Sequence, residues 1–396
     1  MERPHGGTQP TRATRVTGGA PVLAAAALCA FTLVGALVAQ WLIDDNMRTD
    51  TRVYYHSLEW MGEGGLYDVG SLAYSFIYPP FAALLMAPIL LVDVDTAARI
   101  AVVVSIPMAF ASYLIVLRRS PAGLVHGAVA PLAAAMLWLA PAFDTLRLGQ
   151  INAAIALLMA VDAVLIERRH RYGGVLTGLA AAIKVSPALF VVFLLVARRS
   201  RAAINATASA AALTLIAAIA MPVETARFFT DVLYETSAIA DARPRENQSI
   251  AGVLTVAFGD GPWVAALSLA CSVGLVIAAL LRARRFAAAD DIVGLMVMAS
   301  CVGYAVSPLS WMHHLWFVPA AIVALLRRHG SRAERFVAVL GIAALGAAHR
   351  VFPLGALGTP AMVSFLVLAA MLLPVSEPGS DGAEVIRTAK AATRGR

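Results

Sequence analysis

DDNMRTDTRVYYH, residues 44–56, is a polar stretch that follows one long apolar run and precedes another, which opens with Tyr78-Pro79-Pro80. It places three aspartates, Asp44, Asp45 and Asp50, at the edge of an apolar region and away from any soluble domain. Charge beside hydrocarbon destabilises a membrane protein, so such residues often mark a functional site. The competing interpretation is an ordinary hydrated connector.

The composition around this stretch is that of an integral membrane protein. Of 396 residues, 60% are hydrophobic and 14% are charged, and the mean hydropathy is +0.77. Soluble domains contain about 25% charged residues. The net charge is +7, but the basic residues gather in short runs between apolar segments, which indicates topology rather than nucleic-acid binding. The three cysteines lie in apolar segments and favour neither disulfides nor a cysteine metal site.

Basic clusters are typical of cytoplasmic loops. They occur at residues 118–119, 168–171, 198–201, 282–285 and 327–328 and in the C-terminal tail. The apolar stretches between them are about 20 residues long, the length of one membrane helix. The sequence therefore predicts an all-α, polytopic bundle of about 10–13 transmembrane or re-entrant helices. We expect a cytoplasmic N-terminus (1–20), a membrane domain (21–375) that starts with an uncleaved span, and a cytoplasmic basic tail (376–396).

Two segments do not fit a simple alternation of spans. Residues 173–197 have basic clusters on both sides but are long enough for only one span, and Lys184 and Pro187 interrupt them. A helix hairpin or re-entrant pair, bent at this lysine and proline, would return both ends to the same side. Residues 79–117 contain two apolar halves, and two full spans there would put Arg118 outside. One half is therefore a candidate re-entrant segment.

This topology gathers the unusual polar residues at the outer face. They are Asp50, Arg147, Gln150, Asn152, Asn247, Gln248, Ser249, His313 and His314, together with Lys184 if its hairpin bends outward. A carboxylate, imidazoles and cations on one membrane face suit general-base chemistry beside a phosphate.

Asp50 is the best-placed base among the three aspartates. It is expected in a loop, where it would be ionised at neutral pH without a large desolvation shift. Asp44 and Asp45 are rivals that spacing alone does not exclude. A structural alternative is that Asp50 caps a helix that starts near Thr51.

The other candidates have structural alternatives as well. Lys184 or Arg147 could neutralise a phosphate, although a lysine can also extend to the interface and an arginine can pack against a loop. Gln150 and Asn152 could bind sugar hydroxyls or cap the next helix. Adjacent His313 and His314 point in different directions, so we expect one at the site and no shared metal. The Tyr78-Pro79-Pro80-Phe81 segment is interpreted as the structural start of a span.

Several motifs resemble those of glycosyltransferase family 87, the actinobacterial polyprenyl-phosphate-mannose-dependent mannosyltransferases. The ordered set lies between about residue 41 and residue 330 and comprises Asp50-Thr51-Arg52-Val53-Tyr54, Gly65-Leu66-Tyr67-Asp68, Tyr78-Pro79-Pro80-Phe81, Gly149-Gln150-Ile151-Asn152, Lys184-Val185-Ser186-Pro187, Asn247-Gln248-Ser249-Ile250-Ala251-Gly252 and Ser307-Pro308-Leu309-Ser310-Trp311-Met312-His313-His314. Each piece alone is weak, but the ordered set is fairly specific.

The resemblance implies the C-type glycosyltransferase fold in the plasma membrane, with an active site on the outer (periplasmic) face. It implies an inverting transfer of mannose from a polyprenyl phosphate to a glycolipid of the phosphatidylinositol mannoside or lipoarabinomannan type. Asp50 would then be the base, with His313 and His314 at the site. The substrate-binding candidates would be Tyr54, Arg147, Gln150, Asn152, Lys184, Asn247 and Trp311. The expected partners are the lipid-linked donor, the glycolipid acceptor and membrane lipids, with no nucleic acid, no cofactor and no required metal.

Two other functions remain compatible with the sequence. A secondary transporter also places charges near broken helices, but it predicts inverted halves and ionisable residues near the bilayer midplane. A polymerase or ligase that uses another lipid carrier would share the outer-face arrangement.

Overall fold

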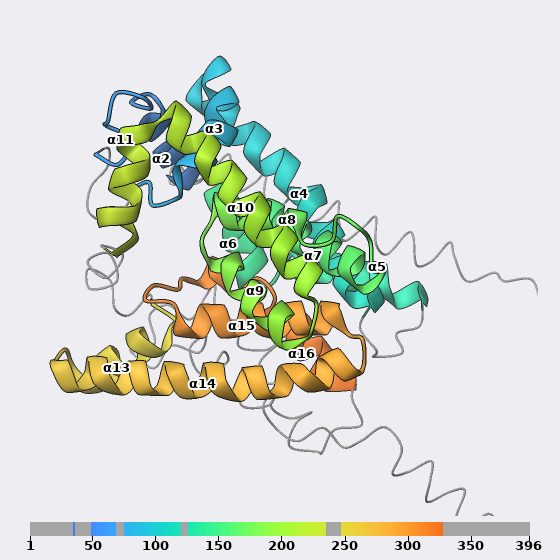
Figure 1. Cartoon of the computed structure of the whole chain (residues 1–396). Coiled ribbons are helices and arrows are strands. Elements are labelled where there is room, and N and C mark those ends of the chain that lie inside the picture. Colours follow the sequence, from blue (N-terminus) through green and yellow to red (C-terminus); the bar gives the residue numbers. More distant parts are fainter. Residues whose placement is uncertain (1–34, 36–48, 69–74, 120–125, 235–246, 328–396) are drawn as a thin grey trace, which may run out of the picture.

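The computed structural model of the chain describes residue 35 and residues 49–68, 75–119, 126–234 and 247–327. Within these ranges the chain is helical, with no strand, so the predicted all-α architecture is confirmed (Figure 1). The helices are α2 (Thr49–Leu58), α3 (Pro80–Met86), η1 (Ala87–Leu91), α4 (Val94–Arg119), α5 (His126–Met136), α6 (Ala140–Leu148), α7 (Asn152–Glu167), α8 (Val175–Ile183), η2 (Ser186–Ala188), α9 (Leu189–Val196), α10 (Ser200–Ala220), α11 (Pro222–Arg227), η3 (Phe228–Val232), α13 (Ile250–Phe258), α14 (Pro262–Ala288), α15 (Ile292–Val306), η4 (Met312–His314) and α16 (Val318–Arg327). The predicted domain boundaries, Asp44, Asp45 and the predicted first span lie outside the described residues.

Three of the described helices, α4, α10 and α14, are long and apolar enough to cross a membrane. The pair α5 and α6, bent by 59°, makes a fourth candidate if it counts as one broken span. Residues 79–117 contain one spanning helix, α4, preceded by the short α3–η1 segment, so they do not form two full spans. The predicted total of about 10–13 helices covers the whole chain and stays a prediction.

The predicted hairpin in residues 173–197 is confirmed. Helix α8 ends at Lys184, whose backbone is extended (φ −146°, ψ 130°), and the chain resumes as η2 and α9. Both ends of the hairpin lie beside the start of α10, because Asn205 Nδ2 donates to Gly173 O at 2.8 Å and α9 ends shortly before Ser200. The nine residues of α8 rise about 13 Å, roughly half of a hydrocarbon core of about 30 Å. The hairpin therefore carries Lys184 at its tip and returns.

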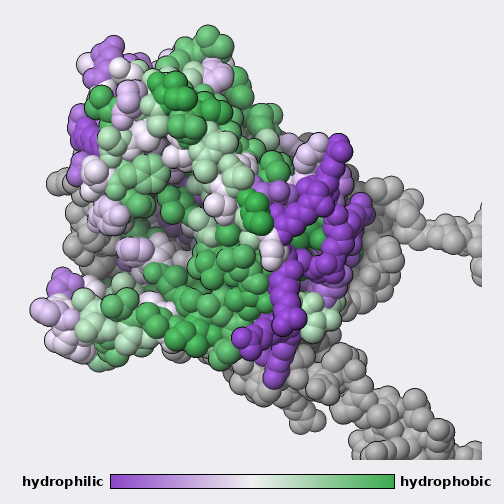
Figure 2. Space-filling view, in the orientation of Figure 1, coloured by the Kyte–Doolittle hydropathy of each residue, from purple (hydrophilic) through white to green (hydrophobic). Residues whose placement is uncertain are grey.

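One aspartate joins three loops at the base of this hairpin. Asp290, between α14 and α15, accepts a hydrogen bond from Arg199 and lies 3.7 Å from Arg169 Nη2. These arginines belong to two of the basic clusters that mark cytoplasmic loops, so the ion pairs hold several loops at one end of the bundle. Figure 2 shows strongly hydrophilic residues as a band along one side of the molecule, next to a wide hydrophobic surface. This separation is the one expected for a bundle embedded in lipid.

Small residues let α8 approach α10 closely. Gly174, which precedes α8, and Gly178 of α8 face Ala202 and Ala206 of α10, and a Cβ on Gly178 would clash with Ala206 O and lie 2.6 Å from Ser209 Cβ. Close approach of backbones at small residues is a main source of helix association in membranes, where lipid and core side chains are equally apolar. Asp162 of α7 also holds α8, because its carboxylate accepts from the backbone N–H groups of Gly174 and Thr177 at 2.9 Å.

We predict that Gly178→Ala destabilises the protein. The added methyl group has no space between α8 and α10, so the two helices must separate, at a cost of about 1–3 kcal/mol. Thermal unfolding of the full-length protein in detergent should show a lower Tm.

Gly274→Ala is the matched control, because it makes the same change in a membrane helix, α14, where nothing lies within 4 Å of the added Cβ. It should leave the Tm unchanged or raise it, since alanine stabilises a helix by about 1 kcal/mol relative to glycine. Equal Tm values for the two variants would contradict the proposed close packing.

Candidate functional site

The predicted outer-face residues meet around one short loop, Gly149–Asn152, between α6 and α7. Gly149 ends α6 in the left-handed conformation (φ 68°, ψ 37°), and Thr51 Oγ1 of α2 donates to its carbonyl at 2.9 Å. A Cβ at Gly149 would clash with that hydroxyl, so only glycine allows α2 to approach the loop this closely. The loop thereby places Gln150 next to α2 and Asn152 at the start of α7.

Gln150 is the centre of a buried hydrogen-bond network with Asp50. Its Nε2 donates to Asp50 Oδ2, and its Oε1 accepts from Tyr54 at 3.0 Å and from Tyr78 at 2.9 Å. The two phenol oxygens are themselves 3.0 Å apart. Because both tyrosines donate to the same oxygen, the amide group has one favourable orientation, with its N–H groups toward the carboxylate. No described residue donates to Asp50 Oδ1, which leaves that oxygen available to another group.

The expected environment of Asp50 was wrong. Asp50 does not lie in a hydrated loop but in the first turn of α2, where its side chain is 9% exposed. Burial raises its pKa to about 6, against the opposing effects of the Gln150 hydrogen bond, Lys184 and Arg147. Charge is desolvated here because the carboxylate faces Gln150 and the bundle rather than solvent. The raised pKa places Asp50 close to the range that suits a general base near neutral pH. Its side chain bonds Gln150, so helix capping does not account for it.

Asn152 connects Lys184 to the histidine pair. Lys184 Nζ donates to Asn152 Oδ1 at 3.0 Å, and Asn152 Nδ2 donates to the carbonyl oxygen of His313 at 3.1 Å. The lysine comes from the tip of the hairpin, so the bend does bring it to the other predicted residues. Its amine also lies 5.4 Å from the centre of the Tyr78 ring. Asn152 therefore hydrogen-bonds a lysine and a neighbouring loop, and its side chain does not cap a helix.

The two histidines have different environments, as expected. His314 Nδ1 accepts the backbone N–H of Trp311 at 3.1 Å, so in the neutral ring Nε2 carries the proton. Burial, with Lys184 nearby, lowers the pKa of His314 well below its usual range and favours this neutral form. His313 is 3% exposed, and its Nε2 has no hydrogen-bond partner among the described residues. Trp311 Nε1 is also buried and unpaired within the described part of the chain. Unpaired buried polar atoms are costly unless a ligand or water satisfies them.

Tyr78 is a site residue that sequence analysis interpreted as structural. Its hydroxyl belongs to the Asp50 network, and its ring lies over Lys184, so it bridges the two halves of the site. The sequence did contain one signal for this role. Tyr78 lies at the predicted outer end of a span, and the other site residues have the same position in their own segments. Because two prolines follow Tyr78, the segment was interpreted as the start of a helix.

Asn247 and Arg147 make other contacts. Asn247 Oδ1 accepts from the backbone N–H of Ser310 at 2.9 Å and of Ser249 at 3.1 Å, and its Nδ2 donates to Pro308 O at 2.8 Å. These bonds join two loops, and the assignment of Asn247 to the substrate stays a prediction. Arg147 is paired with Asp144 at 3.3 Å and does not line the cavity described next, although it influences the pKa of Asp50.

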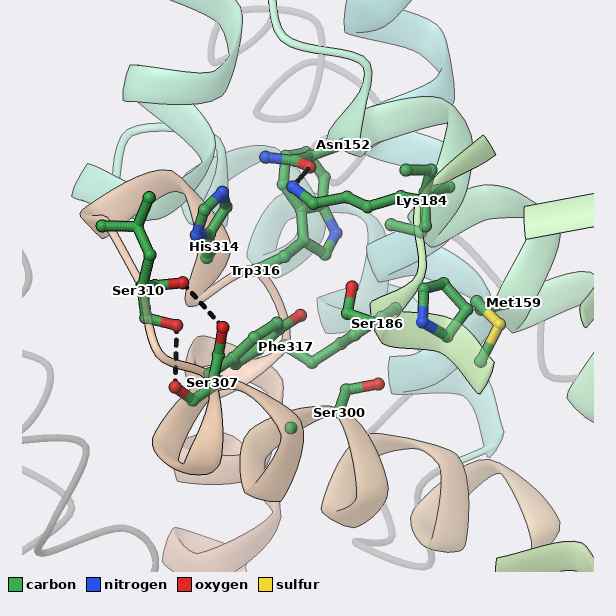
Figure 3. A pocket seen from close by; sticks show the side chains of 16 residues that line it. Asn152, Met159, Lys184, Ser186, Ser300, Ser307, Ser310, His314, Trp316 and Phe317 are labelled. Carbon is green, nitrogen blue, oxygen red and sulfur yellow. Dashed lines mark hydrogen bonds between the residues drawn. The ribbon is translucent and has the colours of Figure 1, made fainter. Parts of the chain in front are cut away.

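A cavity of about 90 Å³ opens beside these residues (Figure 3). The Asn152–Lys184 pair and His314 lie together toward the top of Figure 3, and Ser300 lies on the opposite side. Ser186, at the tip of the hairpin, lines the same cavity. Within the described residues, no group of three or more His, Cys, Asp or Glu side chains could hold a metal ion. The arrangement thus offers a carboxylate on one side of the Gly149–Asn152 loop and N–H donors with a lysine amine on the other.

Comparison with known proteins agrees with the motifs. The family model described as "Glycosyltransferase family 87" matches residues 76–309, a range that contains Tyr78, the Gly149–Asn152 loop and Lys184 but stops short of Asp50 and the histidine pair. No solved structure gave a significant match.

Curated relatives come from mycobacteria. A "Polyprenol-phosphate-mannose-dependent alpha-(1-2)-phosphatidylinositol mannoside mannosyltransferase" of Mycobacterium tuberculosis is 31% identical and covers 70% of both chains. Its namesake in Mycolicibacterium smegmatis is 30% identical over 82% of this chain and 81% of the relative. The corresponding pentamannoside mannosyltransferase of M. smegmatis is 29% identical over 85% and 82%. Since the family model covers more than half of the chain and the relatives extend over most of it, the chain belongs to glycosyltransferase family 87.

Proposed function

We propose that the protein transfers mannose from polyprenyl-phosphate mannose to a hydroxyl group of a phosphatidylinositol mannoside or a related cell-envelope glycolipid. The names of the curated relatives support this donor and acceptor. One structural observation carries the assignment of residues. The Gly149–Asn152 loop hydrogen-bonds a buried carboxylate through Gln150 and a lysine through Asn152. Family membership favours a transferase over the transporter that the sequence left open.

In the proposed reaction, Asp50 is the general base. Gln150 holds Oδ2, so Oδ1 accepts the proton of the acceptor hydroxyl as that oxygen attacks the anomeric carbon. The bond between the anomeric carbon and the phosphate oxygen breaks on the opposite side, and the electron pair leaves with the polyprenyl phosphate. This single displacement inverts the anomeric centre. The leaving phosphate is already charged and needs little protonation, so one base is sufficient.

Lys184 is the proposed partner of the leaving phosphate. Lys184 lines the cavity, and burial lowers its pKa to about 7, against the opposing effect of Asp50, so the amine carries its positive charge mainly at and below neutral pH. His314 lines the same cavity with a neutral ring whose Nε2 carries a proton. The half-helix that follows Lys184 contributes the positive end of its dipole, as in other broken membrane helices that bind anions. The unpaired Nε2 of His313 and Nε1 of Trp311 are further candidate ligands for substrate. No metal or cofactor is assigned to this reaction.

We place the site at the outer face of the plasma membrane. The arginines at the base of the hairpin belong to predicted cytoplasmic clusters, and the tip of the hairpin extends away from that base. The Gly149–Asn152 loop meets this tip, whereas α7 begins at Asn152 and ends near the arginines. A lipid-linked donor and a glycolipid acceptor would both reach such a site from the outer leaflet.

We predict that Asp50→Asn abolishes most of the transfer activity. Asparagine keeps the shape of the side chain but cannot take a proton, and a general base contributes about 10²- to 10⁴-fold to kcat. The measurement is the transfer of labelled mannose from polyprenyl-phosphate mannose to extracted glycolipids by the purified full-length protein.

Asp93→Asn is the matched control, because Asp93 is exposed and accepts backbone hydrogen bonds from Asp95 and Thr96, a role that asparagine can also perform. It should retain normal turnover. Near-normal turnover of Asp50→Asn, with loss in Asp44→Asn or Asp45→Asn, would transfer the role of base to one of those residues.

The activity should depend on pH through Asp50. Its pKa of about 6 means that kcat/KM falls as the pH drops below about 6, because the protonated carboxyl cannot act as a base. In Gln150→Met the donor hydrogen bond that stabilises the carboxylate is lost, so the pKa of Asp50 rises and the acidic limb moves to higher pH. A profile of kcat/KM against pH for both proteins tests this. An unmoved limb in Gln150→Met would show that Gln150 does not control the base.

We predict that Lys184→Met raises the donor KM by about 10- to 100-fold, the range expected for losing a hydrogen bond to a charged group. Lys184→Arg should recover part of the affinity because it keeps the charge. Arg147→Met tests the rival cation and should have the smaller effect, since Arg147 is already paired with Asp144. A larger increase of KM in Arg147→Met would show that Arg147, and not Lys184, binds the phosphate.

A further inference from the structure

A buried glutamate outside the candidate site holds the loop that follows α2. Glu224 lies in α11, just after the long helix α10, and is 2% exposed. Its Oε1 accepts the backbone N–H of Gly62 at 2.8 Å and that of Gly64 at 3.0 Å. Figure 1 shows α11 beside this loop, although Gly64 and Glu224 are 160 positions apart in the sequence. A buried carboxylate is costly unless hydrogen bonds satisfy it, so these two bonds tie the loop to α11.

The backbone of the loop is shaped to receive a carboxylate oxygen. Gly62 (φ 85°) and Gly64 (φ 81°) both have left-handed backbones, which residues with a side chain rarely adopt. Backbone N–H groups that converge in such a turn form a concave site for an anion. Glu224 supplies this anion from within the chain. Without the carboxylate, the two N–H groups lose their shared acceptor, and the loop is no longer fixed at this point.

Two further contacts join the same loop to α11 and η3. Arg227 is ion-paired with Asp68, and the ring of Phe228 lies 6.1 Å from that of Tyr67. The side chains of the ion pair are 34% and 59% exposed, and exposed pairs contribute little because water screens them. Glu224 is therefore the main polar attachment of the loop.

Tyr67 connects this loop to the candidate site. Its hydroxyl donates to the backbone oxygen of Tyr78 at 3.0 Å. Tyr78 in turn donates to Gln150 Oε1 at 2.9 Å, and its ring lies 5.4 Å from Lys184 Nζ. A displacement of Tyr67 therefore moves a residue that contacts both halves of the site.

We propose that Glu224 is a positioning residue for Asp50. By fixing the loop, it keeps Tyr67 against the backbone of Tyr78. Tyr78 then keeps the N–H groups of Gln150 directed at the carboxylate. This inference rests on the proposed function, which makes Asp50 the base, and it extends the machinery of the site to α11.

The pKa of Asp50 reports this positioning. The polar and charged groups around its carboxylate are Gln150, Lys184, Arg147, Tyr54 and Tyr78. When Tyr78 is held less firmly, the hydrogen bond from Gln150 weakens and the pKa of Asp50 rises. Loss of the negative charge of Glu224 would by itself lower the pKa of another carboxyl group. Because the two effects have opposite signs, a rise identifies positioning rather than charge.

The test is a titration of the Asp50 carboxyl group in the purified full-length protein. Infrared spectroscopy measures its midpoint as the difference between each protein and the same protein carrying Asp50→Asn. Glu224→Met keeps the length of the side chain but accepts no hydrogen bond. We expect it to raise the midpoint by about one pH unit, the size that a hydrogen bond to a charged group supports. Glu224→Gln loses the same charge but keeps an oxygen for both N–H groups, so its midpoint should stay at or below the wild-type value.

Glu63→Met is the matched control, because it makes the same change at an exposed side chain of the same loop and should leave the midpoint unchanged. Tyr67→Phe tests the next step with Glu224 intact, since it removes only the hydroxyl that holds Tyr78. It should also raise the midpoint. The double variant Glu224→Met/Tyr67→Phe should raise it no further than the larger single change, because both act through one chain of contacts. The Tm of each variant shows whether it remains folded.

An unchanged midpoint in Tyr67→Phe, or in folded Glu224→Met, would overturn the proposal, as would equal rises in Glu224→Met and Glu224→Gln. The titration uses neither mannose nor a lipid donor, so its outcome is independent of the transfer assay. Absence of mannose transfer from a protein with the expected midpoints would overturn the proposed function and leave the positioning role in place. Mannose transfer with unmoved midpoints would overturn the positioning role alone.

Discussion

The hydrogen bond between Lys184 and Asn152 is the interaction on which the site depends. A buried lysine at the tip of a hairpin within an apolar bundle is destabilising unless a polar partner meets it there. Asn152 supplies the oxygen, which turns its N–H groups toward the carbonyl of His313. One amide thus joins three segments that are distant in sequence, namely the hairpin, the start of α7 and the histidine loop. Its orientation follows from having a donor on one side and an acceptor on the other.

Gln150, two residues before Asn152, has its amide oriented in the same way. Tyr54 and Tyr78 both donate to its oxygen, so its N–H groups face Asp50. The two amides project from one short loop, one toward a carboxylate and the other toward a lysine. The two amides thus hold the carboxylate and the lysine in fixed positions. The cost of burying Asp50 appears as a raised pKa, which suits a base.

The helices around this loop explain how such polarity is tolerated inside an apolar bundle. Glycine and alanine residues bring α8 against α10, and Asp162 holds the start of α8 against α7. Asp290 ties the arginine loops together at the base of the hairpin. These contacts leave a narrow cavity between α7 and α15 beneath the hairpin tip. The bundle therefore holds the charged groups in place and leaves an apolar space next to them.

Several properties could be predicted from the sequence because they depend on local composition. Apolar length and basic clusters determined the membrane class and the helical architecture. The conflict between one-span length and two basic flanks determined the hairpin at residues 173–197, and ordered motifs determined the family. The same topology grouped Asp50, Gln150, Asn152, Lys184 and the histidine pair, which the structure brings together.

Only the tertiary structure decided what each of these residues contacts. The Asp50–Gln150 bond joins residues 100 positions apart, and the Asn152–His313 bond joins residues 161 apart. No local pattern reports such contacts, so sequence analysis expected Asp50 in a loop and interpreted the Tyr78 segment as structural. Burial, hydrogen-bond partners and pKa are properties of the packed neighbourhood. The sequence determined which chemical groups are present in these segments, and packing decided which of them face one another.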